Sequence, residues 1–487
     1  MNYPVWDVPT IGVGLVVAIV ATIHVLIAHF AIGGGAFLFV AEVWASRQPD
    51  GAKIRAWLHK FATFFLVYTT VFGAMTGVGI WFSIQLANPE ATSLLIHQYV
   101  FAWATEWVTF LGELTMLYLY YYGWEKNSPR LQIVLAGLYF VIAWLSLFII
   151  NGILTFMLTP GGWSLSNPDI AAGFFNPGYL PSLILRTVVM FLVAGLGALL
   201  IASRIRDDES LKERIIVFST RWAIPAALTA PFLFYWYWRT LPAKTTEIIV
   251  AGKVGVSGAR LESLSTFVLT VLTAAAVILL SNVVFRWKPR ALTFASAMAM
   301  FLMAQVGFVA AEFAREMARK PYVIYDTLYS NSLWKHTAQD AEQMRRPYLD
   351  SARWDPPTEP LSLERGEWLF RFQCSSCHTR DGYRQILRRT ESWATTTGFH
   401  FLGTLDRLGV MPRFQGDEQD RAALSAYILS LHGQRVTPQE IYDAGMIEGA
   451  QEHGSDPATR AEGGTPEGGE SAEGANTRTR GPEEVTP

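Results

Sequence analysis

Two cysteines and a histidine in the C-terminal third of the chain carry the most specific chemical signal in the sequence. Cys374 and Cys377 are the only cysteines among 487 residues, and His378 follows directly, which gives a CxxCH motif. In this motif the two thiols form thioether bonds to the vinyl groups of a haem, and the histidine binds its iron. A disulfide or half of a zinc site are the alternatives, but the sequence has no second cysteine pair. The motif therefore predicts one covalently attached haem c.

A second axial ligand for that iron is expected downstream of the motif. Met411, in the stretch GVMPRF, offers a thioether sulfur after a segment long enough to wrap around a haem. His400 is the competing ligand. We expect Met411 to bind the iron opposite His378.

The sequence around the motif resembles a small class I cytochrome c domain over residues 361–435. LSLERGEWLFRFQ is its expected first helix and DEQDRAALSAYILSLHG its last. The last helix has apolar residues at the spacing of a buried helix face, which are Leu424, Tyr427, Ile428 and Leu431. Residues 319–360 are expected to link this domain to the preceding chain. Residues 436–487 have few large apolar side chains and are expected to be disordered.

The elements before this domain must lie in a membrane. The chain is 51% hydrophobic and only 16% charged, which is typical of a membrane protein. Its net charge is -2 and its basic residues are spread out, so no nucleic-acid partner is expected. Runs of about 20 apolar residues, enough to cross a bilayer as helix, recur within residues 1–318. They are residues 11–45, 62–87, 99–123, 131–159, 181–203, 221–239, 264–285 and 291–318. The predicted fold is all-α: a polytopic bundle of about eight transmembrane helices followed by a small all-α cytochrome c domain.

Lysine and arginine in the connecting loops predict the orientation, because these residues are retained in the cytoplasm. The loops after the first, third, fifth and seventh runs are basic, whereas the N-terminus and the loops after the second and fourth runs are not. Only the loop after the sixth run departs from this pattern. We therefore expect a multi-pass protein of a bacterial cytoplasmic membrane with both termini and the cytochrome c domain in the periplasm. That compartment is where haem c is attached.

Ionisable side chains inside the apolar runs are costly to bury and so mark candidate sites. The first run holds His24 and His29, the third holds Glu106 and Glu113, and the last holds Glu312, Arg315 and Glu316. Glu106 and Glu113 are seven residues apart and share a helix face, as do Glu312 and Glu316, four apart. Each could instead bond a neighbouring helix or face water. Together they indicate a buried redox centre with ligands and proton-relay groups.

The membrane region is similar to subunit I of the cytochrome bd family of quinol oxidases. ATIHVLIAHFAIGGGAFLFVAEVW resembles the family's first helix, which implies that His24 binds a haem. GELTMLYLYYYGWE resembles its third helix, with Glu113 at one acidic position of the family and Glu106 one residue from another. EMARKPY resembles the signature ExGRQPW, which implies that Glu316 binds a haem and that Arg319 is the arginine of the signature.

The departures from the family concern its quinol-oxidising end. The family binds a low-spin haem b through a fifth-helix His and a seventh-helix Met, whereas here Arg186 stands about where that His belongs and the seventh run lacks Met. The loop between the sixth and seventh runs is short, and the cytochrome c domain replaces the family's ninth helix.

The resemblance implies a haem bound by Glu316 and another bound by His24, of type b, type d or both. Glu312 is a further candidate ligand, Arg315 and Arg319 can neutralise carboxylates or a haem propionate, and Glu113 and Glu106 would relay protons. The leading hypothesis is a respiratory oxidoreductase subunit that moves electrons between cytochrome c and buried haems, ending in oxygen reduction. It implies a subunit II-like membrane partner and a soluble periplasmic cytochrome or other carrier, and leaves quinone binding open.

Two other functions are considered. The first is an electron-transfer subunit between a quinol-using partner complex and periplasmic cytochromes, without oxygen chemistry. The second is a membrane anchor for a monohaem cytochrome, which does not account for the number of buried ionisable residues.

Overall fold

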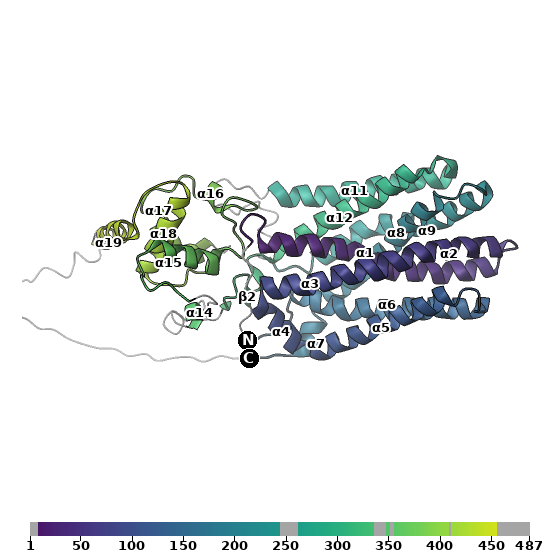
Figure 1. The fold of residues 1–487 in the computed structure, drawn as a ribbon, viewed down its shortest axis with the longest axis horizontal. Helices are drawn as coiled ribbons and strands as arrows, with labels where there is room; N and C mark the ends of the chain where they lie inside the picture. The colour runs from purple at the N-terminus through teal and green to yellow at the C-terminus, as the bar shows by residue number, and fades with distance from the viewer. Residues whose placement is uncertain (1–7, 244–261, 336–346, 351–354, 409–410, 455–487) are drawn as a thin grey trace, which may run out of the picture. The chain divides into compact units, whose positions relative to one another are not determined.

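The computed structural model describes residues 8–243, 262–335, 347–350, 355–408 and 411–454. Long helices dominate the part before residue 320, and they are drawn side by side in Figure 1. They are α1 (Val13–Ser46), α2 (Gly51–Val67), α3 (Gly73–Ala87), α5 (Val100–Tyr122), α6 (Pro129–Phe156), α8 (Tyr179–Ala202), α9 (Glu209–Trp238), α11 (Glu262–Trp287) and α12 (Phe294–Arg319). A π-helical segment, Tyr68–Phe72, joins α2 and α3 into one long span. The short helices α4 (Pro89–Gln98) and α7 (Ile170–Phe174) lie in connections.

Seven helices of the described chain are long and apolar enough to cross a membrane. The sequence analysis predicted about eight, and seven of the predicted runs correspond to these helices. The eighth run, 99–123, also forms a helix, α5, but α5 is less apolar than the others. Two glutamates and several tyrosines and tryptophans lower the mean hydropathy of α5. The helix nevertheless packs along the transmembrane helix α6 (Figure 1).

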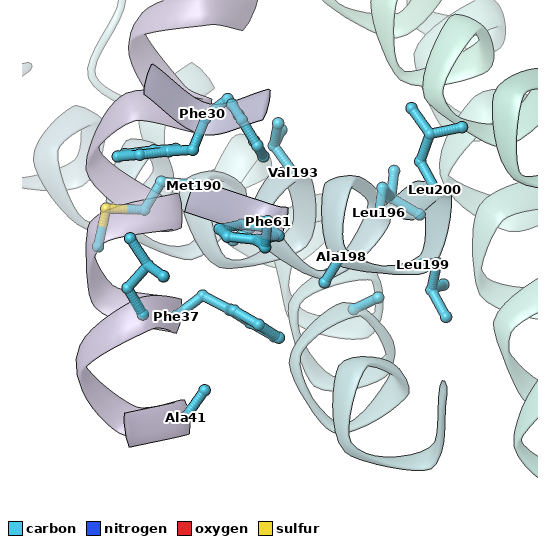
Figure 2. Close-up of a cluster of buried hydrophobic side chains, with 14 of the residues drawn as sticks. Phe30, Phe37, Ala41, Phe61, Met190, Val193, Leu196, Ala198, Leu199 and Leu200 are labelled. Atoms are coloured by element: carbon cyan, nitrogen blue, oxygen red, sulfur yellow. The ribbon is translucent and has the colours of Figure 1, made fainter. Parts of the chain in front are cut away.

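The centre of the bundle is α1, which packs against α2, α3, α6, α8 and α12. Phe30 and Phe37 of α1, Phe61 of α2 and Met190 of α8 are fully or almost fully buried there (Figure 2). Gly33 allows α1 to approach α8 closely, because a Cβ at this position would overlap the carbonyl of Met190. Small residues at a helix interface have this role in membranes, where helices associate through close packing.

Two short strands follow α12. β1 (Tyr322–Ile324) and β2 (Leu328–Tyr329) pair in antiparallel fashion. They lie in the segment 319–360 that the sequence identifies as a linker, so part of this segment is ordered. Helix α14 (Pro347–Asp350) lies in the same segment.

The cysteine-containing part is helical, as predicted. Its helices are α15 (Leu363–Leu369) with the π-helical continuation Phe370–Cys374, α16 (Ile386–Arg389), α17 (Thr397–Leu402) and α18 (Glu418–Leu431). The predicted buried face of α18 is confirmed: Leu424, Tyr427 and Ile428 are buried, and Leu431 packs against their cluster. The expectation of a disordered tail from residue 436 is wrong for residues 438–454, which form helix α19 (Pro438–Gly454). The remaining tail lies outside the described residues.

Candidate functional site

The CxxCH motif occupies one helical turn. The backbone N–H groups of Cys377 and His378 both donate to the carbonyl of Cys374, at 3.0 and 2.9 Å. The turn follows directly on the π-helical segment that extends α15. Both thiols and the imidazole therefore project from one short, hydrogen-bonded segment, as attachment to a single haem requires.

The protonation of His378 suits iron binding. Its Nδ1 lies 3.3 Å from the carbonyl oxygen of Arg384. Because a carbonyl can only accept, Nδ1 carries the proton and Nε2 is left with a free lone pair, the arrangement found in metal-bound histidines. Burial, reinforced by the charge of Arg389, lowers the pKa of His378 to about 4, so the ring is neutral near pH 7.

Cys374 and the predicted second ligand share one apolar cluster. Cys374 and Met411 are partly buried and both pack against the cluster that contains Leu402, Leu405 and Phe414. Burial raises the pKa of the Cys374 thiol to about 12, so the thiol is protonated near pH 7. The competing ligand His400 lies on α17 with its ring edge-on to Phe399. Two thiols, a histidine and a thioether in one apolar domain are a donor set that fits haem c. Across the described residues, no three His, Cys, Asp or Glu side chains gather as a group able to hold a metal ion.

His24 lies about a third of the way along α1 and faces α3. Its Nδ1 is 3.0 Å from Oγ1 of Thr76, whose hydroxyl donates to the carbonyl of Phe72 at 2.7 Å. The threonine oxygen therefore accepts from Nδ1, and Nε2 of His24 is free to bind a metal. Gly77 gives the ring its room, because a Cβ there would lie 3.2 Å from Cε1 of His24. The donor and its orientation fit a haem ligand.

Glu316 lies in the last turn of α12, and both of its carboxylate oxygens are paired. Oε2 accepts from Arg319 at 2.5 Å, and Oε1 lies 3.3 Å from Nζ of Lys320. Arg319 is also held by the carbonyl of Val323 at 3.0 Å. Binding of iron by Glu316 would require that one of these two ion pairs open.

Glu312 is paired with different cations, although it lies only one turn before Glu316. It accepts from Nε of Arg315 at 2.8 Å and lies 3.9 Å from Arg186 of α8. Glu312, Arg315 and Arg186 line the same cavity as His29. The two carboxylates that share a face of α12 thus have different direct partners, although Arg315 interacts electrostatically with both.

Glu106 and Glu113 form part of a longer polar row on α5. Glu106 accepts from the hydroxyl of Ser146 on α6 at 3.2 Å, and Glu113 is half-buried. Tyr120 continues the same seven-residue spacing, and its hydroxyl donates to Glu42 of α1 at 2.9 Å.

Glu42 is a buried acid that the sequence analysis did not single out. It is fully buried, and Arg55 donates to its second oxygen at 3.1 Å. The sequence did contain a signal for Glu42, because it is an acidic residue within the first apolar run, where a buried carboxylate needs hydrogen-bond or ion-pair partners.

Comparison of the whole structure first defines the class of protein. The chain is a multi-pass helical membrane protein with a bd oxidase-like fold. It is similar to the bd oxidase from Geobacillus thermodenitrificans, with a TM-score of 0.55 and 15% sequence identity over 64% of this chain and 87% of that chain. At this identity the likeness shows the fold.

The sequence comparison then identifies the family of the membrane region. Residues 15–233 match the family described as cytochrome bd terminal oxidase subunit I. His24, Glu106 and Glu113 lie inside the matched residues, whereas Glu316 and the CxxCH motif lie beyond them. No curated protein matches the chain.

Proposed function

We propose that the protein is a membrane-bound haem oxidoreductase that moves electrons between a covalently bound haem c and haems buried in the bundle, ending in oxygen reduction. One observation carries the proposal. A CxxCH turn with a free imidazole nitrogen on His378 occurs in the same chain as a membrane region of the bd terminal oxidase subunit I family.

The cytochrome c domain, residues 361–435, would be the external electron port. Cys374 and Cys377 would hold haem c covalently, and His378 and Met411 would bind its iron. When bound, this group supplies one-electron transfer. The chain contributes an apolar cluster around Cys374 and Met411, and a histidine that is fixed in one tautomer by the Arg384 carbonyl.

The membrane part would hold haem b, haem d or both. His24 is supported by its free Nε2, and Glu316 by its position in the last turn of α12, from which the chain continues toward the cytochrome c domain. Arg319, already paired with Glu316, would neutralise a propionate or the carboxylate, and Arg315 would do the same for Glu312, the further candidate ligand. Glu113 and Glu106 would relay protons along one face of α5.

The cellular setting follows from the basic loops. Both termini and the cytochrome c domain would lie in the periplasm of a bacterium, with the bundle in its cytoplasmic membrane. A subunit II-like membrane protein and a soluble periplasmic cytochrome or similar carrier would be partners, and quinol remains a second candidate donor through the family.

One observation favours the alternative function, an electron-transfer subunit between a quinol-using complex and periplasmic cytochromes. Arg186, at about the position of a family haem ligand, is ion-paired with Glu312. Oxygen uptake with reduced cytochrome c as donor distinguishes the two functions, since only the oxidase consumes oxygen.

The test of the proposal is a count of haems by type in the His24→Ala and Glu316→Ala variants. Each variant is expected to lose non-covalent haem and to keep haem c. His97→Ala and Glu90→Ala, which alter exposed side chains of α4, are the matched controls. Unchanged haem content in both site variants would contradict the proposal.

A further inference from the structure

A cavity of about 190 Å³ lies between α1, α8, α9, α11 and α12. Its walls are mostly apolar. The polar and charged side chains that line it are His29, Ser182, Arg186, Tyr237, Glu312 and Arg315. Neither His24 nor Glu316 is among the lining residues, whereas Glu312, the further candidate ligand, is one of them.

The charges in the cavity wall do not balance. Arg186 and Arg315 are two cations, and Glu312, at 3.9 and 2.8 Å from them, is the one anion. In the described part of the chain, Nη1 of Arg315 is buried without a hydrogen-bond partner. An unpaired charge in a membrane interior is expensive, which favours a ligand that brings a negative charge.

Arg186 is held in place by a chain of hydrogen bonds. Its Nε donates to Ser182 at 3.3 Å, Ser182 donates to the side-chain carbonyl of Asn151 at 2.7 Å, and Asn151 donates to the carbonyl of Tyr179 at 2.9 Å. These partners are on α8 and α6. The guanidinium is therefore positioned before any ligand enters, which reduces the entropic cost of binding.

The remaining wall fits an apolar body. Phe234 of α9 and Phe308 of α12 line the cavity, and Leu272 of α11 lines it while being 44% exposed. The cavity thus reaches the outer surface of the bundle, which in a membrane faces lipid chains. A ligand can enter sideways from the bilayer with its apolar part against these side chains.

We propose that this cavity binds an apolar molecule bearing an anionic oxygen group, a carboxylate or a phosphate, and that Arg315 and Arg186 recognise that group. Planar guanidinium groups bind both kinds of anion through paired hydrogen bonds. Two sources share this chemistry, the propionate of a haem and the headgroup of an acidic phospholipid.

The test uses the purified full chain in detergent and four variants. Arg315→Gln and Arg186→Gln remove a recognising charge, and Glu312→Gln removes the competing anion. Arg221→Gln is the matched control, because Arg221 is an exposed arginine of α9 that does not line this cavity. The readouts are binding of phosphatidylglycerol against phosphatidylcholine to delipidated protein, and the number of haems per chain.

If the ligand is a phospholipid, Arg315→Gln weakens phosphatidylglycerol binding by about tenfold or more, the effect of losing one charge-assisted hydrogen bond. If the ligand is a haem, Arg315→Gln has fewer haems per chain than the wild type. Phosphatidylglycerol then binds weakly to the wild type and to the variant alike. Glu312→Gln is expected to bind the anion at least as tightly as the wild type, a result that misfolding would not produce.

The proposal is overturned if Arg315→Gln and Arg186→Gln match the Arg221→Gln control in both readouts. It is also overturned if Glu312→Gln weakens anion binding. Neither result would bear on the proposed haem ligation by His24 and Glu316, because that ligation is tested with other variants, His24→Ala and Glu316→Ala.

Discussion

The hydroxyl of Tyr120 donates a hydrogen bond of 2.9 Å to Oε1 of Glu42, and both side chains are buried in the bundle. This bond ties α5 to α1. Arg55 from α2 donates to the other oxygen of Glu42. A carboxylate with no exposure is thereby satisfied by donors from two other helices, α5 and α2, and is linked to the polar row of α5.

Tyr120→Phe is expected to lower the free energy of unfolding by about 1.5–3 kcal/mol, because Glu42 loses a charge-assisted bond in a buried site. The measurement is the midpoint of thermal unfolding in detergent. Tyr122→Phe, at an exposed position of the same helix, is expected to leave the midpoint unchanged. If Tyr120→Phe and Tyr122→Phe unfold at the same midpoint temperature, the Tyr120 hydroxyl does not contribute to the free energy of unfolding.

Gly366→Ala is expected to destabilise the proposed cytochrome c domain by about 2 kcal/mol or more, because a Cβ at this position would overlap the carbonyl oxygen of Ala423 on α18. The crossing of α15 and α18 depends on that close approach. Denaturant unfolding followed by the haem c absorption measures the effect. Gly14→Ala is the control, since its Cβ meets nothing within 4 Å. A stability equal to wild type in Gly366→Ala would mean that the two helices do not cross as described.

Replacement of both Cys374 and Cys377 by Ala is expected to abolish covalent haem, because no other thiol exists in the chain. Haem staining of a denaturing gel reports covalent attachment directly. Ser375→Ala, between the two cysteines, should keep the stained band. Non-covalent haem should be retained in the double variant, and a stained band in that variant would rule out thioether attachment at this motif.

Gly77→Val is expected to lower non-covalent haem as His24→Ala does. A Cβ alone would lie 3.2 Å from the His24 ring, so two further methyl groups force the ring to move. Gly73→Val, one turn earlier on α3, is the control, because a Cβ at this position would contact Ile27 and not the His24 ring. The haem-to-protein ratio of the purified variants is the measurement. Wild-type haem content in Gly77→Val would argue against His24 as a ligand.

Apolar runs predicted the positions of the long helices because bilayer thickness sets their length, but they did not predict where those helices begin. α2 starts at Gly51 and α9 at Glu209, both well before the apolar runs, and their polar first turns contact each other. Lys53 of α2 bonds Asp208, the cap of α9, at 2.7 Å. Such pairs between distant segments leave no periodic signal in a sequence.

The candidate site was predicted in its residue types but not in its pairings. CxxCH is a local motif, so the turn that it forms follows from adjacent residues. The ion pair between Glu312 and Arg186 joins two helices that are far apart in the sequence, so it was not predictable from α12. Helix α19 lacks the large apolar face that marks a buried helix, which explains why its segment was expected to be disordered.

The central claim is that one chain carries both haem c and buried, non-covalent haem. Reduced-minus-oxidised and pyridine haemochrome spectra of the purified protein count the haems by type. One haem c per chain is expected together with haem b, haem d or both. Haem c without any non-covalent haem would leave an anchored cytochrome and rule out the proposed function, and non-covalent haem without haem c would remove the proposed electron port.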